Sequence, residues 1–145
     1  MNAFTLMKKD HKRVKDLFRK IVRAKDTAER EVYFTEIKKE LDAHAYMEEN
    51  VFYPALKKEK PTRDLILESY EEHHVVKLLL AELDELPKCQ EEWSAKLKVL
   101  RENVEHHIQE EEGDIFPKAK KILGDQAEPV GEEMQKTKEY FLDNL

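Results

Sequence analysis

Apolar side chains recur at alternating intervals of three and four residues along almost the whole chain, and this period constrains the fold more than any other feature. The first such stripe comprises Phe4, Met7, His11, Val14, Phe18 and Ile21. Residues three and four apart lie on one face of an α-helix, whereas a half-buried strand would alternate apolar and polar positions. Glycine, which weakens helix interiors, occupies only three positions. The chain is therefore predicted to be all-α.

The pattern predicts five helices, at residues 3–24, 26–54, 62–87, 91–123 and 128–144. Asp26 has the side chain of a helix N-cap, Pro54 is expected to end or bend the second helix, and Gly124 is expected to close the fourth. The first four helices have short connections, so consecutive helices should be antiparallel neighbours. We predict one domain, residues 1–145, folded as an up-down-up-down four-helix bundle with a short C-terminal fifth helix. That helix either packs on its own bundle or contacts a second copy, so a monomer or weak homodimer is expected.

Charge and cysteine content exclude several classes of protein. The net charge is −6 and the lysines are interleaved with acidic residues. This argues against nucleic-acid binding, because phosphate backbones are held by clustered Lys and Arg. No apolar run reaches about 18 residues, so no membrane span is predicted, and the first ten residues lack the apolar core of a signal peptide. Cys89 is the only cysteine, so no internal disulfide can form and a cytoplasmic location is expected.

Two pairs of segments repeat one another in register. HAYMEENVFYP at residues 44–54 and HIQEEEGDIFP at residues 107–117 each place a histidine four residues before a glutamate and end in a proline. DHKRVKDLF at residues 10–18 aligns with EHHVVKLLL at residues 72–80. Each half of the chain is therefore a predicted helical hairpin with a histidine on its first helix and an HxxxE motif on its second.

These repeats should bring four histidines and two glutamates to one depth of the bundle. They are His11, His44, His73, His107, Glu48 and Glu111. Unpaired carboxylates in an apolar interior cost roughly several kcal/mol each or become protonated. Hydrogen bonds between histidine and glutamate would reduce that cost. A dinuclear metal centre would also account for the duplication, because imidazole and carboxylate ligands suit iron, manganese and zinc.

Neighbouring residues leave some assignments open. His74 is the alternative to His73, because Leu67, His74, Leu78 and Ala81 form a second, weaker stripe. His107 is preferred to His106, since only His107 keeps Glu111 and the later proline in step with the first motif. Tyr70, one turn before His73, either packs in the core or hydrogen-bonds near the metals. The remaining acidic neighbours are expected to be exposed or to lie beside the ligands, and they are Glu49, Glu110 and Glu112.

Several segments resemble the hemerythrin-like, HHE cation-binding family. They are DH at 10–11, HAYMEENVFYP, EEHHVVKLLLAEL at 71–83, HHIQEEEGDIFPKAK at 106–120 and the final GEEMQKTKEYF. The resemblance implies a four-helix bundle that holds a non-heme di-iron centre, with two Fe ions joined by an oxo or hydroxo bridge. By position it maps the family's metal ligands to His11, His44, Glu48, His73, His107 and Glu111.

Two departures from the oxygen-carrying members bear on function. Those proteins have an HxxxH pair on the third helix and an aspartate on the fourth, whereas this chain has Lys77 and Glu111. Two histidines, two bridging carboxylate oxygens and one bridging oxygen would leave each iron with an open position. The protein is therefore not expected to be principally an oxygen store.

Three functions follow as hypotheses. In the first, the di-iron site binds, senses or reduces O₂, peroxide or nitric oxide. In the second, the protein is an iron donor or enzyme that repairs damaged iron–sulfur proteins under nitrosative or oxidative stress. Repair proteins of the family commonly add a cysteine-containing N-terminal domain, whereas the first helix here is predicted almost at Met1, which favours the first hypothesis. The third is a metal-free or zinc-stabilised interaction module. Whether the protein is an enzyme is left open.

Overall fold

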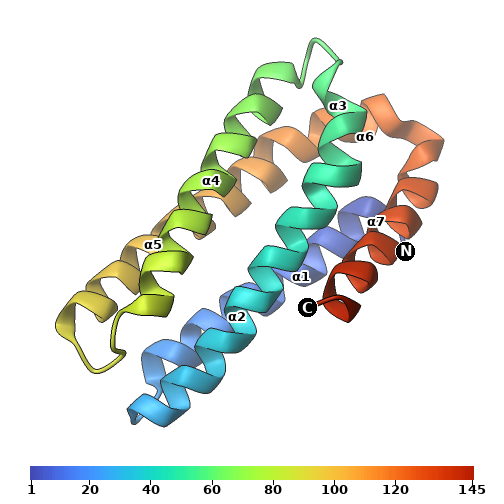
Figure 1. Ribbon diagram of the computed structural model, residues 1–145. Coiled ribbons are helices and arrows are strands. Elements are labelled where there is room, and N and C mark those ends of the chain that lie inside the picture. Colours follow the sequence, from blue (N-terminus) through green and yellow to red (C-terminus); the bar gives the residue numbers. More distant parts are fainter.

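The computed structural model describes residues 1–145 and is built from helices joined by short connections (Figure 1). Four long helices run up and down the molecule: α1 (Ala3–Arg23), α2 (Thr27–Met47), α4 (Arg63–Glu85) and α5 (Glu91–Glu110). Each hairpin pairs neighbours in sequence, α1 with α2 and α4 with α5. The all-α four-helix bundle predicted from the apolar period is confirmed. No helix combines the length and apolarity that crossing a membrane requires.

Side-chain and backbone chemistry at particular residues sets some of the helix ends. The Asp26 carboxylate accepts a hydrogen bond from the Glu29 N–H at 2.9 Å and caps α2, as predicted. Thr62 precedes α4 without capping it, and its hydroxyl instead donates to the Leu56 carbonyl at 2.7 Å. Gly124 adopts a φ of 51°, a left-handed conformation that favours glycine, and ends the α-helix of the second motif.

Each HxxxE motif leads into one turn of π-helix. The turn η1 (Glu48–Phe52) precedes α3 (Tyr53–Lys57), and η2 (Glu111–Ile115) precedes α6 (Phe116–Leu123). The N–H of Tyr53 reaches back five residues to the Glu48 carbonyl. Proline in a regular α-helix clashes with the carbonyl four residues before it, and the wider π turn relieves that clash. Pro54 was expected to end or bend the second helix, and the helix does not end there but continues through the π turn to Lys57.

Two apolar cores lie along the bundle with a polar layer between them. One core surrounds Phe18, Phe34 and Trp93, towards the α1–α2 and α4–α5 connections. The other lies under α3 and α6 and includes Phe52 and Phe116. The residues that separate the two cores are buried and ionisable, and most of them belong to the repeated motifs. The fold therefore concentrates its buried charge in one layer.

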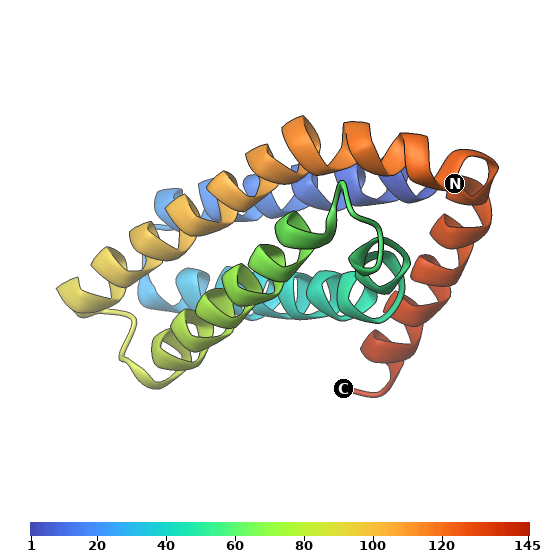
Figure 2. The ribbon, with the colours of Figure 1, turned by 90° about the horizontal axis from the view of Figure 1, so that it is seen from above.

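After the short 3₁₀ turn η3 (Gly124–Gln126), the fifth helix α7 (Ala127–Asp143) folds back over α1 and α2 (Figures 1 and 2). Met134 is buried against the core, and the Phe141 ring lies 5.1 Å from that of Tyr46. A Cβ atom at Gly131 would lie 2.4 Å from the Met1 carbonyl oxygen, so only glycine permits this approach. The fifth helix thus packs on its own bundle, one of the two expected arrangements.

Candidate metal centre

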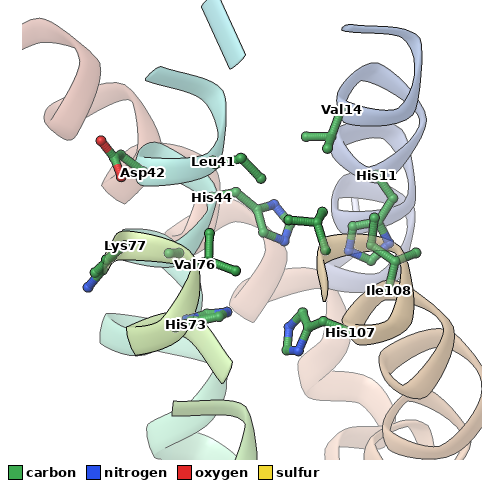
Figure 3. A pocket seen from close by; sticks show the side chains of 12 residues that line it. His11, Val14, Leu41, Asp42, His44, His73, Val76, Lys77, His107 and Ile108 are labelled. Carbon is green, nitrogen blue, oxygen red and sulfur yellow. The ribbon is translucent and has the colours of Figure 1, made fainter. Parts of the chain in front are cut away.

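The structure brings together the six side chains singled out by the repeats. Their helices are α1 for His11, α2 and η1 for His44 and Glu48, α4 for His73, and α5 and η2 for His107 and Glu111. None is more than 8% exposed. Figure 3 shows the four imidazoles turned towards a common centre from four different helices. The alternatives His74 and His106 are exposed and lie outside this cluster.

The cluster divides into two groups of three residues. We call His11, His44 and Glu111 the His44 half-site, and Glu48, His73 and His107 the His107 half-site; within each, one ligand atom per residue lies within 4.8 Å of the others. Each glutamate also faces a histidine of the other group. Glu48 Oε1 lies 3.2 Å from His73 Nε2 and 3.3 Å from His44 Nε2. Glu111 lies 3.0 Å from His11 Nε2 and 3.3 Å from His107 Nε2. This geometry suits carboxylates shared between two cations.

Two atoms of the cluster are left without a hydrogen bond. They are His44 Nε2 and Glu48 Oε2, the two buried side-chain polar atoms of the protein that have no hydrogen-bond partner. The 3.3 Å separation of His44 Nε2 from Glu48 Oε1 lacks hydrogen-bond geometry. An unsatisfied buried polar atom costs about 1–3 kcal/mol. Cations between the two half-sites would satisfy both atoms, so the donor set fits a metal pair.

An outer carboxylate holds the other ring nitrogen of each histidine. The Nδ1 atoms of His11 and His107 lie 2.6 Å from Glu112 and Glu72, and those of His44 and His73 lie 2.9 Å from Asp10 and Glu49. An ionised carboxylate only accepts hydrogen bonds, so Nδ1 carries a proton, and Nε2 is the atom that each ring can offer to a metal once the ring is neutral. Metal-binding histidines are commonly fixed in this way.

The outer carboxylates follow the internal repeat, and sequence reasoning missed half of them. Asp10 and Glu72 each precede a first-helix histidine and contact the HxxxE histidine of their own hairpin. Glu49 and Glu112 each follow an HxxxE glutamate and contact the first-helix histidine of the other hairpin. The two acids that were missed, Asp10 and Glu72, are visible in the sequence as the aligned DH and EH pairs. Which histidine each acid contacts follows only from the rotation of each helix about its axis.

Buried charges perturb the pKa values within the cluster. Burial lowers the pKa of His44, but Glu48 and Asp10 outweigh burial and raise it to about 10. Burial opposes protonation of His107 as well, yet Glu111 and Glu72 raise its pKa well above the ordinary value. Burial tends to raise the pKa of Glu111, whereas His107 and His11 hold it well below its usual range. Without metal, the cluster is therefore a network of ion pairs.

Metal uptake is expected to release protons at neutral pH. The folded-state pKa of His44, about 10 against an ordinary 6.5, means that the metal-free protein retains this proton through neutral pH. The proton on His44 stabilises the folded protein fully below pH 6.5, the ordinary pKa of histidine. This stabilisation is lost as the pH rises through about 10. Metal binding needs the neutral imidazole, so metal affinity should rise with pH. Calorimetric titration with Mn²⁺ in buffers of different ionisation enthalpy measures the protons released, and a buffer-independent heat would contradict the expectation.

Tyr53 is the central residue that sequence reasoning missed. It is fully buried, and its hydroxyl lies 3.0 Å from Glu111 Oε2 and 3.2 Å from Glu48 Oε1. Burial and these two carboxylates raise the pKa of Tyr53 well above its ordinary value, so the hydroxyl keeps its proton and donates. Tyr70, considered in its place, is only half-buried, and its hydroxyl lies 3.5 Å from the Glu49 carbonyl oxygen. The sequence feature that could have identified Tyr53 is the aromatic residue before each proline, which is Tyr in one repeat and Phe in the other.

Loss of the Tyr53 hydroxyl is expected to destabilise the metal-free protein. The variant Y53F deprives a buried carboxylate of a donor, and hydrogen bonds to charged groups contribute about 2 kcal/mol. Urea unfolding of chelator-treated protein measures the change in the free energy of unfolding. The matched variant Y70F loses only a long hydrogen bond near the surface, so its change should stay below about 0.5 kcal/mol. Equal changes in the two variants would show that the central hydroxyl has no special role.

A cavity of about 40 Å³ adjoins the imidazoles. Figure 3 shows its lining: His11, Val14, Leu41, Asp42, His44, Ala45, His73, Val76, Lys77, Val104, His107 and Ile108. Aliphatic side chains form much of the wall. Lys77, which stands where oxygen carriers have a fifth histidine, points away from the imidazoles, is half exposed and pairs with Glu49 at 3.4 Å. A cavity needs about 10–15 Å³ of such space to admit one water molecule, so this cavity has room for a small molecule.

Comparison with known proteins agrees with this geometry. The family model described as the hemerythrin HHE cation binding domain matches residues 2–119. An uncharacterised protein of Mycobacterium tuberculosis is 37% identical over 123 residues, which are 81% of this chain and 71% of that protein. A protein of Nostoc named DNA nickase is 30% identical over 119 residues, or 80% of this chain. The match spans only 33% of the Nostoc protein.

A solved structure shares the whole fold. It is the crystal structure of a hemerythrin HHE cation binding domain-containing protein from Mycobacterium kansasii, with a TM-score of 0.88 and 29% identity. The similarity covers 99% of this chain and 89% of that one. The family match extends over most of the chain and includes all six clustered side chains. This chain therefore belongs to the hemerythrin HHE cation-binding domain family.

Proposed function

We propose that this protein holds a pair of iron ions between its two half-sites and that the centre binds or reduces a small ligand such as O₂, peroxide or nitric oxide. The ligands to the metals would be His11, His44, Glu48, His73, His107 and Glu111. Bound iron would supply the open coordination positions and the electrons for the small ligand. The protein would supply the cavity for the small ligand and the orientation of the imidazoles.

The cavity beside the imidazoles is the observation that carries the proposal. Its volume of about 40 Å³ is sufficient for a diatomic molecule or peroxide. Its aliphatic walls, which include Val76 and Val104, favour an uncharged or weakly hydrated ligand over a multiply charged anion. A ligand that entered the cavity would lie beside the four imidazoles.

The protein side chains would hold the site ready for such a ligand. The outer carboxylates fix each imidazole with Nε2 directed inward. The Tyr53 hydroxyl holds a proton 3.0 Å from Glu111 Oε2 and can share it with that carboxylate. Burial of all six inner side chains favours a resident metal pair over an iron donor, whose ligands would need to be reached by an acceptor protein.

Metal content and cavity access together test the proposal. Elemental analysis of protein purified without added metal should find about two irons per chain, and the visible spectrum should respond to O₂, peroxide or nitric oxide. V76F fills the cavity and should keep the iron while slowing the response. V75F makes the same change at the neighbouring exposed position and should leave the rate unchanged. Zinc, or no metal after anaerobic loading with ferrous iron, would overturn the proposal, and so would equal rates in the two variants.

A further inference from the structure

The outer carboxylates are related by the repeat, but their own partners differ. Asp10 Oδ2 lies 2.9 Å from His44 Nδ1, and its other oxygen, Oδ1, lies 2.9 Å from the Lys138 ammonium. The same ammonium donates to Glu40 Oε1 at 2.7 Å. Asp10 is 5% exposed and Glu40 is 8% exposed. Lys138 is therefore held between two buried carboxylates, one of which is bonded to a predicted metal ligand.

The second hairpin has no equivalent of this lysine. Lys138 lies on α7, the helix that falls outside the internal repeat. Glu72 occupies the position of Asp10 in the other hairpin and contacts His107, but the other ionisable groups grouped with it are His106 and the acid Glu110, not a lysine. The pseudo-symmetric centre is thus made asymmetric by the helix that packs over one of its sides.

His44 depends on its outer partner more than the other three histidines do. The other imidazoles also have a hydrogen-bond partner at Nε2: His11 donates to Glu111, and Nε2 of His73 and of His107 each lies 3.3 Å from the Tyr53 hydroxyl. His44 Nε2 has none. In the metal-free protein its ring is therefore oriented by hydrogen bonding only through Asp10.

We propose that Lys138 is a positioning residue for the metal centre, which acts through Asp10 to fix His44 and so couples the affinity of the His44 half-site to the packing of α7. This inference rests on the proposed function, because it takes His44 to be a metal ligand. Arg13 also donates to Glu40 at 3.4 Å, but through its other oxygen, Oε2. Without the ammonium, Asp10 and Glu40 would face each other as buried like charges with no cation between them. Asp10 would turn away from Glu40, and the imidazole would lose its preset orientation.

Stepwise metal binding tests the proposal. Metal-free protein is titrated with Mn²⁺ against a competing chelator, which separates the two affinities. K138Q should weaken one of the two by about tenfold or more, the usual effect of losing such a support, and should leave the other within about twofold. K138R retains the charge and should restore the affinity. K77Q is the matched control, because Lys77 contacts Glu49 behind His73 at 3.4 Å but is 52% exposed, so water can replace it.

Combining K138Q with a substitution of Asp10 separates a positioning role of Lys138 from a general loss of stability. In D10A the hydrogen bond to His44 is already lost, so adding K138Q should cause no further loss of metal affinity even if it lowers stability. If K138Q does not fold, K138Q/E40Q removes one charge of each sign and should show the same selective loss. Equal weakening of both metals, additive losses in D10A, or unchanged affinities in K138Q would overturn the inference and leave the proposed function standing. A wild-type protein that binds fewer than two metal ions would overturn both.

Discussion

Metal removal by a chelator is expected to lower the thermal unfolding midpoint by about 15–30 °C. A ligand that binds only the folded state, present at a thousandfold excess over its Kd, stabilises that state by about 4 kcal/mol. Two metals would contribute about 8 kcal/mol, and a domain of this size shifts by about 2–4 °C per kcal/mol. The buried ion pairs of the metal-free cluster limit the loss but do not remove it, because His44 Nε2 and Glu48 Oε2 stay unsatisfied. Differential scanning calorimetry of metal-loaded and chelated protein measures the shift.

Two glutamates of the second hairpin provide the matched comparison for this shift. E111A removes a fully buried carboxylate that faces both half-sites, so its midpoint should be the same with and without metal. E105A removes a carboxylate that pairs only with Arg101 on the surface of α5, and it should retain the full metal-dependent shift. A midpoint that does not respond to chelation in the wild type, or that responds equally in E111A, would argue against a metal pair at this cluster.

The helices and the six inner side chains could be predicted because both depend on short-range patterns. The apolar period fixes which face of each helix is buried, and Asp26 and Gly124 mark ends through their own backbone and side-chain chemistry. An HxxxE spacing places two side chains on one face whatever the surrounding fold. The repeat then indicates that the two hairpins pack against each other at this depth, because each hairpin alone carries only two of the four histidines and one of the two glutamates.

The rest of the site depends on contacts that no short-range pattern specifies. Asp10 and Glu72 contact histidines 34 and 35 residues away, so their role follows from how the helices of each hairpin are rotated. Lys138 contacts Asp10 across 128 residues, and the sequence left open where its helix packs. Tyr53 reaches the centre only because a π turn stands before it. The proline that follows predicts an end or a bend of the helix, and a wider turn allows the helix to continue past it.

Deletion of Asn50 is expected to destabilise the protein by about 5 kcal/mol or more. The deletion would shorten η1 by one residue and restore a regular α-turn, which rotates the following residues by about 100°. Tyr53 and Leu56, both fully buried, would turn away from the interior, and each loss of a large core side chain costs about 3–5 kcal/mol. Pro54 would at the same time meet the carbonyl four residues before it. Urea unfolding of the metal-free variant measures the loss, and elemental analysis shows whether metal is still bound without Tyr53 at the centre.

The substitution N50A separates the effect of residue number from that of the side chain. Asn50 is exposed, and its amide donates only to the Tyr46 carbonyl of its own helix, so N50A should cost less than about 1 kcal/mol. A deletion no more harmful than N50A would mean that the chain after Glu48 finds its register without the π turn. If the expected difference is found, the extra residue in η1 is what allows the helix that carries His44 and Glu48 to supply a central hydroxyl as well. A regular α-helix could not do this, because positions five apart lie about 140° apart around its axis, whereas η1 brings Glu48 and Tyr53 to within 3.2 Å.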